Sequence, residues 1–393
     1  MNIDKLASSV AARMQAATSA GAVPGVVLGV TDRQQTRYEQ GFGLRALGQS
    51  QPMSLDTVCW IASMTKAVTS VAAMQLIESG QVGLDAPAAQ WLPALADVPV
   101  LTGWSANGEP QLRPAARPIT VRHLLTHTAG FSYDFWNTDI TRYMSVTGVP
   151  GIIGCARAAL TTPLVADPGE RWEYGINIDW LGLLVEAVSG RKLGQTLADK
   201  VLGPIGMHDT AFAISADMRR RLAKIHARTP DGLAATDIEL PQSPEFEMGG
   251  GGLYGTLGDY LKFTRMILND GLAEGGRVLR PETVALMAQP AIGALELPHV
   301  RSVQPQTSND FEVCPGVATT WGLGFAINKQ AVPGGRSAGS LAWAGLANSY
   351  YWIDRRRGIA GVYLTQILPF ADVESLPLFA DFERLTYAAL PLA

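Results

Sequence analysis

A serine and a lysine lie three residues apart at the start of an apolar segment, and such a pair could perform nucleophilic chemistry. The tetrad Ser63-Met64-Thr65-Lys66 leads into residues 67–77, where apolar side chains recur every three or four positions. Because this spacing predicts a helix, Ser63 and Lys66 should share one face of its first turn. A partly desolvated amine can accept the serine proton, and the helix N-terminus offers free backbone N–H groups where negative charge would develop.

The same S-x-x-K pattern occurs a second time, in Ser189-Gly190-Arg191-Lys192. That tetrad follows a helical pattern at residues 178–188 and contains a glycine, which is typical of a helix C-terminus that faces water. The pattern should arise by chance about once or twice in a chain of this length. The Ser63 tetrad therefore needs support from elsewhere in the sequence.

A tyrosine in a loop before the helix at 178–188 could complete the proton transfer. Tyr174 ends the segment 167–174, and a loop at this position can direct a side chain into a cleft. If its phenol lay near Lys66, the ammonium would stabilise the phenolate, and Tyr174 could take the Ser63 proton and return it to a leaving group. The alternative is a tyrosine that simply packs beside Trp172.

An aromatic cluster follows the predicted helical segment at residues 119–125. Tyr133, Phe135, Trp136 and Tyr143 fall in a stretch rich in Asp, Asn and Thr. Such residues can serve local packing, but they can also form the apolar wall of a pocket.

Two patterns invite a metal or phosphate site, and neither is complete. His123 and His127 are four residues apart, yet Leu124 stands where a zinc protease needs glutamate, so we expect them to hydrogen bond the backbone beneath the site. The glycines at 249–252 precede no G-K-[ST] or G-x-G-x-x-G pattern, which favours close backbone packing. We therefore expect neither a metal nor a cofactor.

Another serine lies in a G-x-S-x-G pattern, Gly335-Arg336-Ser337-Ala338-Gly339, which is typical of the nucleophile in α/β-hydrolases. That fold requires a strand before the serine, a helix after it, and a histidine later in the chain. Here a Pro-Gly segment precedes the pattern, a strand follows, and all 5 histidines lie upstream. We therefore assign Ser337 to a loop.

Composition excludes several classes of protein. The 393 residues are 47% hydrophobic with a net charge of −4, which argues against disorder and against nucleic-acid binding. The start of the chain lacks a signal-peptide pattern, and no apolar run reaches membrane-spanning length. The 3 cysteines, Cys59, Cys155 and Cys314, are odd in number and widely spaced, which fits reduced thiols, with Cys59 as a buried apolar filler. We expect a cytoplasmic protein without a membrane partner, acting on a small molecule.

Strand patterns occur at both ends of the chain and helical patterns between them. A helix is expected at residues 3–18 and another at 378–390, with strands at 26–30, 37–42, 321–328, 340–344, 349–354 and 359–366. Pro-rich loops and short helical patterns fill the middle. These patterns predict an α+β fold in which both termini build one antiparallel sheet. We expect residues 1–79 and 256–393 to form this α/β domain, residues 80–255 to form an inserted, mostly helical domain, and the active site to lie between them.

Three motifs in order carry a resemblance to a known family. They are the Ser63 tetrad, Tyr174 in P-G-E-x-W-x-Y, and Trp343-Ala344-Gly345 on a late strand. With them the sequence resembles the serine β-lactamase-like superfamily, and within it the family VIII carboxylesterases and the related lovastatin-type acyltransferases. The likeness spans nearly the whole chain and includes H-L-L-T-H-T-A-G-F at residues 123–131 and Y-G-x-N-x-D-W-x-G at residues 174–182.

The resemblance implies a β-lactamase/transpeptidase-like fold and a role for each motif. It implies that Ser63 is the nucleophile, that Lys66 and Tyr174 move the proton, and that the backbone N–H groups of Ser63 and Leu346 form the oxyanion hole. Trp343 and Gly345 would contact the substrate, as would the aromatic wall of Tyr133, Phe135 and Trp136.

The sequence also departs from the penicillin-recognising members. Trp343 replaces the lysine of their Lys-Thr-Gly motif, so the cation that helps hold a substrate carboxylate is missing. Asn177 lies three residues after Tyr174, whereas their motif is Tyr-x-Asn, so the role of that asparagine is not transferred.

We expect a serine carboxylesterase that hydrolyses neutral, short-chain esters through an acyl-enzyme on Ser63. An acyltransferase that passes the acyl group to an alcohol or amine is the alternative, because the same residues would serve it. A weak β-lactamase or D-amino-acid peptidase activity comes third, and a non-catalytic binding domain is a rival from another class.

Overall fold

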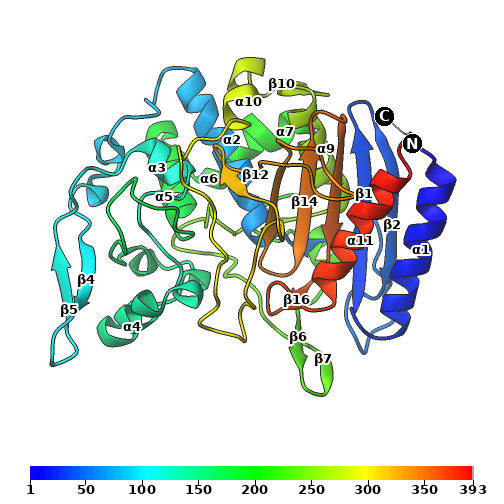
Figure 1. Cartoon of the computed structure of the whole chain (residues 1–393), viewed down its shortest axis with the longest axis horizontal. Coiled ribbons are helices and arrows are strands. Elements are labelled where there is room, and N and C mark those ends of the chain that lie inside the picture. Colours follow the sequence, from blue (N-terminus) through cyan, green and yellow to red (C-terminus); the bar gives the residue numbers. More distant parts are fainter. Residues whose placement is uncertain (392–393) are drawn as a thin grey trace.

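A seven-stranded antiparallel sheet forms the centre of the fold (Figure 1). The computed structural model describes residues 1–391 of the chain. The strands follow the spatial order β11-β12-β13-β14-β15-β1-β2. Their bounds are β1 Gly25–Asp32, β2 Thr36–Gly43, β11 Thr319–Trp321, β12 Ala326–Asn328, β13 Leu341–Gly345, β14 Ser349–Asp354 and β15 Ile359–Leu364.

Strand β1 joins the two ends of the chain within this sheet. It pairs with β2 on one side and with the late strand β15 on the other, where Val27 lies opposite Leu364. Nearly every residue of β1 is buried, because helices cover both faces, and this explains its continuous apolar sequence. The prediction of one antiparallel sheet built from both termini is confirmed.

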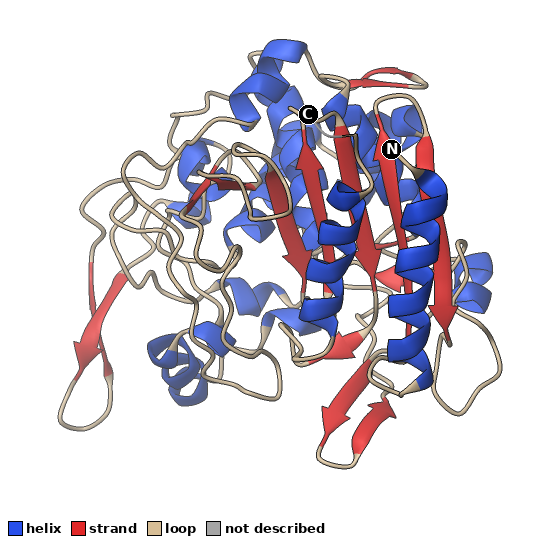
Figure 2. Cartoon of the chain, turned by 45° about the vertical axis from the view of Figure 1, so that its right-hand side comes forward, coloured by secondary structure: helices blue, strands red, loops and turns tan. Residues whose placement is uncertain are grey.

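Helices cover both faces of the sheet. Helices α1 (Ile3–Ser19) and α11 (Ser375–Ala388) run side by side across one face, as Figure 2 shows. The backbone N–H of Asn2 donates to the carbonyl of Ala389 over 2.7 Å, which fastens the start of α1 to the end of α11. On the other face α9 (Leu257–Leu268) packs against β1 and β15, and α2 (Thr65–Glu78) packs against α5 (Asn177–Ser189).

The regular secondary structure between α2 and α9 is mainly helical, as expected, but long loops connect the helices and two hairpins occur that the sequence did not indicate. Hairpin β4–β5 projects from the helical region, and β6–β7 pairs with β16. Both hairpins are short, and the outer strand of each is largely exposed, so their sequences lack a clear apolar alternation. The bounds are β4 Val100–Trp104, β5 Pro110–Arg113, α3 Val121–Leu125, α4 Thr138–Thr147, α5 Asn177–Ser189, α6 Leu193–Leu197, α7 Gly203–Ile205, α8 Ala216–Arg221, β6 His226–Thr229, β7 Gly232–Ala235 and β16 Ile367–Leu368. Further short elements are β3 (Cys59–Trp60), β8 (Tyr254–Gly255), β9 (Leu272–Ala273), β10 (Gly276–Arg277) and α10 (Pro281–Met287).

One predicted strand and one predicted helix have different bounds in the structure. The single strand expected at residues 321–328 is wrong, because the chain turns back at Gly324, with φ 103°, and forms the hairpin of β11 and β12. A positive φ of this kind favours glycine, so the turn is encoded at that residue. The C-terminal helix begins at Ser375, three residues before the start expected from its apolar spacing.

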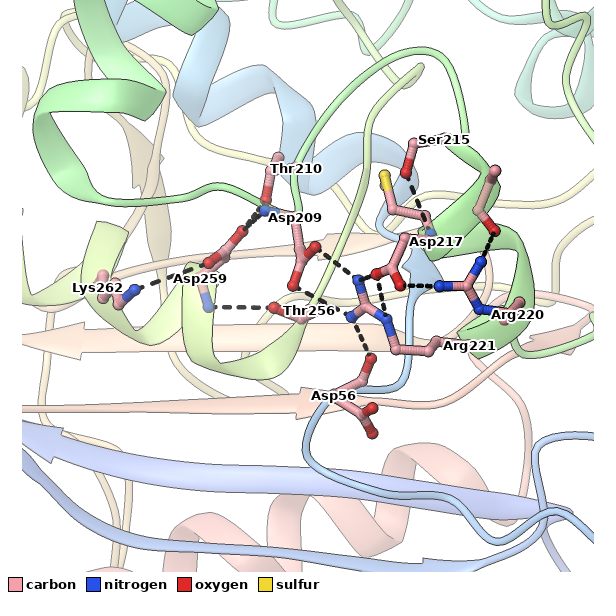
Figure 3. Close-up of polar contacts among 12 residues, drawn as sticks. Asp56, Asp209, Thr210, Ser215, Asp217, Arg220, Arg221, Thr256, Asp259 and Lys262 are labelled. Carbon is pink, nitrogen blue, oxygen red and sulfur yellow. Dashed lines mark hydrogen bonds and ion pairs between the residues drawn. The ribbon is translucent and has the colours of Figure 1, made fainter.

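An ion-pair cluster on α8 anchors the segment that leads to Ser63 (Figure 3). The Arg221 guanidinium, with only 14% of its side chain exposed, binds Asp217 and the Asp209 carboxylate at 2.7 Å. It also donates to the Asp56 carbonyl over 2.8 Å, and the Arg221 carbonyl accepts from the Val58 N–H. Residues 56–58 are thereby fixed directly before β3.

The buried apolar residues form two clusters on opposite faces of the sheet. The larger cluster includes Val68 of α2, Leu181 of α5, Leu261 of α9 and Ile353 of β14, so it runs from the helical region to the sheet. The smaller one lies beneath α1 and α11. No helix within residues 1–391 combines the length and the apolar character needed to cross a membrane.

Candidate active site

Ser63 lies in a tight turn between a short strand and a helix. Strand β3 pairs with β8, a 3₁₀ turn spans Ala62–Met64, and α2 begins at Thr65. Ser63 was expected in the first turn of the α-helix. The structure places it instead in the 3₁₀ turn directly before that helix. Ala62 has φ 45°, a left-handed conformation that is unusual for alanine and is typical of strained functional turns. Ser63 itself remains partly exposed.

Lys66 is completely buried and its amine contacts three oxygen atoms. Nζ lies 3.0 Å from the Ser63 Oγ, 3.0 Å from the Tyr133 hydroxyl and 2.6 Å from the Gly250 carbonyl oxygen. An amine with three such neighbours has its orientation fixed, because each of its tetrahedral positions has a partner. The predicted contact between Ser63 and Lys66 is present.

The charge state of Lys66 is set by two opposing influences. Burial lowers the pKa of its amine, to about 7, because a desolvated ammonium is disfavoured, and the negative charge of Asp179 raises it. The neutral amine, which is the form able to accept a proton, is therefore accessible near neutral pH.

Tyr174 is placed at the same point by the loop before α5. Its hydroxyl accepts the Trp343 indole N–H over 2.8 Å, and Tyr174 lines the same pocket as Ser63. The Lys66 Nζ lies 4.7 Å from the centre of its ring. Burial raises the pKa of the Tyr174 phenol well above its usual value, while the neighbouring Ser63 and Trp343 side chains lower it, so the phenol is protonated at neutral pH.

The structure thus brings a hydroxyl, an amine and a phenol together from two distant segments of the chain: the amine contacts the Ser63 hydroxyl and lies over the Tyr174 ring. The alternative for Tyr174, packing beside Trp172, is also met, since the two rings stack with centroids 5.8 Å apart. That packing holds the phenol in place at the pocket that Ser63 also lines. A proton can pass among these three groups without any large movement.

The backbone of β13 lies directly against the turn that holds Ser63. A Cβ at Gly345 would lie 2.4 Å from the Ile61 carbonyl oxygen, so only glycine permits this approach. Leu346 follows Gly345, and both line the same pocket as Ser63. The two backbone N–H groups expected to stabilise an oxyanion therefore come from neighbouring segments.

An apolar pocket opens over Ser63. Aromatic rings dominate its wall, and the expected residues Tyr133, Phe135, Trp136 and Trp343 all line it. Three other segments contribute wall residues that the sequence did not indicate, namely Ile152, Ile153, Met248 and Phe370.

Asp179 is a buried carboxylate that the sequence analysis did not single out. It occupies the third position of α5 and is fully buried. Its Oδ1 accepts the Gly250 N–H over 2.8 Å, and its Oδ2 accepts the Tyr133 hydroxyl over 3.4 Å. Burial raises the pKa of Asp179, and the positive charge of Lys66 lowers it.

The two histidines and the glycine segment pack around this site. Both histidines were expected to hydrogen bond the backbone. His123 does so, since its Nδ1 accepts the Thr120 N–H, but His127 contacts the Asn177 side chain at 3.1 Å instead. The glycines pack closely against α5, as expected, since a Cβ at Gly250 would lie 2.5 Å from Asp179 Oδ2. The additional finding is that Gly250 supplies its carbonyl to Lys66.

The remaining candidates lie away from these contacts. Ser337 lies in the loop between β12 and β13, as expected, where its N–H donates to Asp354. Cys59, Cys155 and Cys314 are free and buried, and burial raises the pKa of each thiol, which makes a thiolate nucleophile unfavourable.

The chain is similar to several known proteins over nearly its whole length. The family model described as Beta-lactamase matches residues 7–382. The chain is 32% identical to monacolin J acid methylbutanoyltransferase of Aspergillus terreus, covering 93% of this chain and 92% of that protein. It is 32% identical to lovastatin esterase of Penicillium rubens, covering 90% and 92%. The unliganded structure of simvastatin synthase from Aspergillus terreus superposes with a TM-score of 0.87 at 31% identity, covering 99% of each chain.

Proposed function

The chain belongs to the Beta-lactamase family, whose relatives include serine hydrolases and acyltransferases, and on that basis we propose that it hydrolyses neutral carboxylic esters through an acyl-enzyme on Ser63. The observation that carries the proposal is the 3.0 Å contact of the Ser63 hydroxyl with the buried Lys66 amine, at an apolar pocket that Tyr174 also lines. A nucleophile, a base and an acid are the groups that acyl transfer requires.

In the first step the Ser63 oxygen attacks the ester carbonyl while its proton passes to the neutral amine of Lys66. The negative charge on the carbonyl oxygen is stabilised by the backbone N–H groups of Ser63 and Leu346, and donors of this kind contribute about 3 kcal/mol each. The alcohol then leaves with the proton of Tyr174, and the Lys66 ammonium returns a proton to the phenolate.

In the second step a water molecule attacks the acyl-enzyme. The same amine takes a proton from the water and returns it to the Ser63 oxygen as the bond to the acyl carbon breaks, so the acid is released and the Ser63 hydroxyl is restored. The overall reaction consumes one ester and one water and yields one acid and one alcohol.

The pocket wall supports a neutral substrate. Among the described residues that line it, none is lysine, arginine or histidine, and the donors of Lys66 are already directed to protein oxygens. A substrate carboxylate would lose its hydration without gaining an ion pair, which is costly. An ester with an apolar acyl group fits this wall better.

Acyl transfer to an alcohol is the second candidate, and two of the relatives described above favour it. They are named as transferases or synthases, while the third is named an esterase. The two outcomes differ only in whether water or an alcohol attacks the acyl-enzyme. Adding a primary alcohol to the ester assay and measuring the new ester against the free acid separates them.

The proposal is tested by locating the nucleophile. Incubation with a fluorophosphonate should add one phosphonyl group to Ser63, found by mass spectrometry of the digested protein. Ser63→Ala should lose labelling and all turnover of p-nitrophenyl butyrate, whereas Ser337→Ala should keep both. Labelling at another residue, or persistent turnover by Ser63→Ala, would refute the assignment.

A further inference from the structure

Asp179, Tyr133 and Lys66 form a chain of hydrogen bonds that ends at Ser63. Tyr133 connects the two charged groups: its hydroxyl lies 3.0 Å from the Lys66 Nζ and 3.4 Å from Asp179 Oδ2. All three side chains are buried, so water does not compete for these contacts.

The ionised carboxylate decides where the Tyr133 proton points. A carboxylate can only accept, so the single proton of the Tyr133 hydroxyl is directed to Asp179. The Tyr133 oxygen is then left to accept from Lys66. The Gly250 carbonyl can also only accept, so it takes a second N–H of the amine.

This leaves one tetrahedral position of Lys66, and it faces Ser63. In the neutral amine that position holds the lone pair, because both N–H bonds are directed to Tyr133 and Gly250. The lone pair is therefore aimed at the Ser63 hydroxyl, 3.0 Å away.

We propose that Asp179 and Tyr133 are positioning residues of this site: the Asp179 carboxylate fixes the direction of the Tyr133 proton and thereby turns the Lys66 lone pair toward Ser63. This inference rests on the proposed acyl-enzyme function, and it assigns Tyr133 a role beyond the pocket wall. Asp179 touches none of the reacting atoms, and the Tyr133 hydroxyl acts only through its contact with the Lys66 amine.

The competing explanation is a structural one. Acidic residues are common in the first turn of a helix, where they stabilise the N-terminus. The chain contains a matched case in Asp259, at the third position of α9, which is also buried and accepts the Asp209 N–H and the Thr210 hydroxyl (Figure 3). Asp259 therefore serves as a control for the helix-end effect.

The first test is Asp179→Asn, which preserves shape but reverses the proton direction. The Gly250 N–H still requires an oxygen, so the amide NH₂ faces Tyr133, and the Tyr133 proton turns to the Lys66 lone pair. Misorientation of a reacting group costs about 100-fold in rate, and we expect that loss in the rate of Ser63 labelling by a fluorophosphonate. This readout does not depend on knowing the natural ester.

The pH dependence of labelling gives a second readout. The labelling rate should fall at low pH as Lys66 becomes protonated, and we call this fall the acidic limb. Removing the negative charge of Asp179 should shift the acidic limb to lower pH, because the Lys66 ammonium loses a stabilising neighbour. Asp259→Asn should lower thermal stability but leave both the rate and the limb in place. The titratable groups that surround Asp179 and Lys66 are Tyr133, Tyr174, Cys155 and His127.

A double variant separates positioning from structural damage. Tyr133→Phe keeps the ring that stacks on Phe135, with centroids 5.1 Å apart, and removes the hydroxyl through which Asp179 acts. We expect Tyr133→Phe alone to label about 10-fold more slowly, since the lone pair is less well aimed. On that background Asp179→Asn should cause no further loss, because the misdirected proton is gone.

Several results would overturn the inference. One is an equal fold loss from Asp179→Asn with and without the Tyr133 hydroxyl; another is an acidic limb that does not move. If Asp179→Asn fails to fold, the Tyr133→Phe variant decides alone. A labelling rate within twofold of the wild type would then refute the positioning role of Tyr133 and Asp179. A wild-type protein whose Ser63 does not label would instead refute the proposed function.

Discussion

Burial and the Asp179 carboxylate shift the pKa of Lys66 in opposite directions, and the protonation of this amine should govern the pH dependence of the reaction. Burial lowers the pKa of the amine to about 7, although Asp179 opposes the shift. Below that pH the ammonium dominates and cannot accept the Ser63 proton. We therefore predict that kcat/KM for p-nitrophenyl butyrate falls as the pH drops through about 7, approaching tenfold per pH unit. A profile that stays level down to pH 5 would exclude Lys66 as the base.

Trp343 supplies a donor to Tyr174 where the penicillin-recognising relatives have a cation. Trp343→Phe keeps an apolar face in the pocket and removes the indole N–H that binds the phenol over 2.8 Å. A hydrogen bond to a group that becomes charged contributes about 1.5–3 kcal/mol, so kcat should fall about 10- to 100-fold.

KM in the Trp343→Phe variant should change little, because the pocket wall remains. Trp352→Phe is the matched control, since Trp352 is buried in the other core cluster, beneath α11. It should affect stability and leave kcat near the wild-type value. Equal kcat losses in the two variants would mean that the Trp343 effect is one of packing.

At the scale of single residues, the sequence predicted contacts between residues at a fixed local spacing. It did not predict contacts between residues from distant segments. Ser63 and Lys66 are one turn apart, so their contact followed from local geometry. Asp179 had a sequence signal, an acid within an apolar helix, but first-turn acids are ordinary and its contact with Tyr133 depends on tertiary folding. Phe370 reaches the pocket from a loop near the C-terminus, and no spacing rule predicts that.

At the scale of elements, the site depends on how closely β13 approaches the turn at Ser63. In Gly345→Ala the added methyl would meet the Ile61 carbonyl oxygen at 2.4 Å, so the strand must shift. We predict that kcat falls at least about 100-fold, since the oxyanion donors separate, and that the free energy of unfolding falls by about 1–3 kcal/mol. Steady-state kinetics and urea unfolding measure these two effects.

Gly258→Ala is the control for this substitution, because Gly258 lies in α9 and an added Cβ there meets nothing within 4 Å. Alanine is the better helix former, so this variant should gain about 0.5–1 kcal/mol with unchanged kcat. Wild-type kcat in Gly345→Ala would show that the strand need not lie so close.

The elements that were predicted correctly are those with strong periodicity. The helix α1, the strands β1, β14 and β15, and α5 each carry an apolar pattern matched to their burial. The hairpins β4–β5 and β6–β7 were not predicted, because exposed strands such as β5 and β7 need no apolar alternation. The turn at Gly324 was missed because its flanking residues are all apolar and read as one strand.

At the scale of the whole molecule, the sequence predicted that the two termini share a sheet, and it predicted a helical domain inserted between them. The pairing of β1 with β15 confirms the first. The boundaries of that domain, at residues 80 and 255, remain a prediction. The larger apolar cluster bears on it, because Val68, Leu181 and Ile353 from both regions belong to one contiguous core.

A core that runs through both regions should make them unfold together. We predict that urea unfolding followed by far-UV circular dichroism and by Ser63 labelling gives coincident transitions, because neither region retains a core without the other. Leu6→Ala, in α1 on the far face of the sheet, removes a fully buried side chain and should cost about 2–5 kcal/mol. It should move both transitions to lower urea by the same amount, although α1 lies outside the larger cluster. Labelling that disappears at lower urea than the circular dichroism signal would show instead that the helical region unfolds as a separate domain.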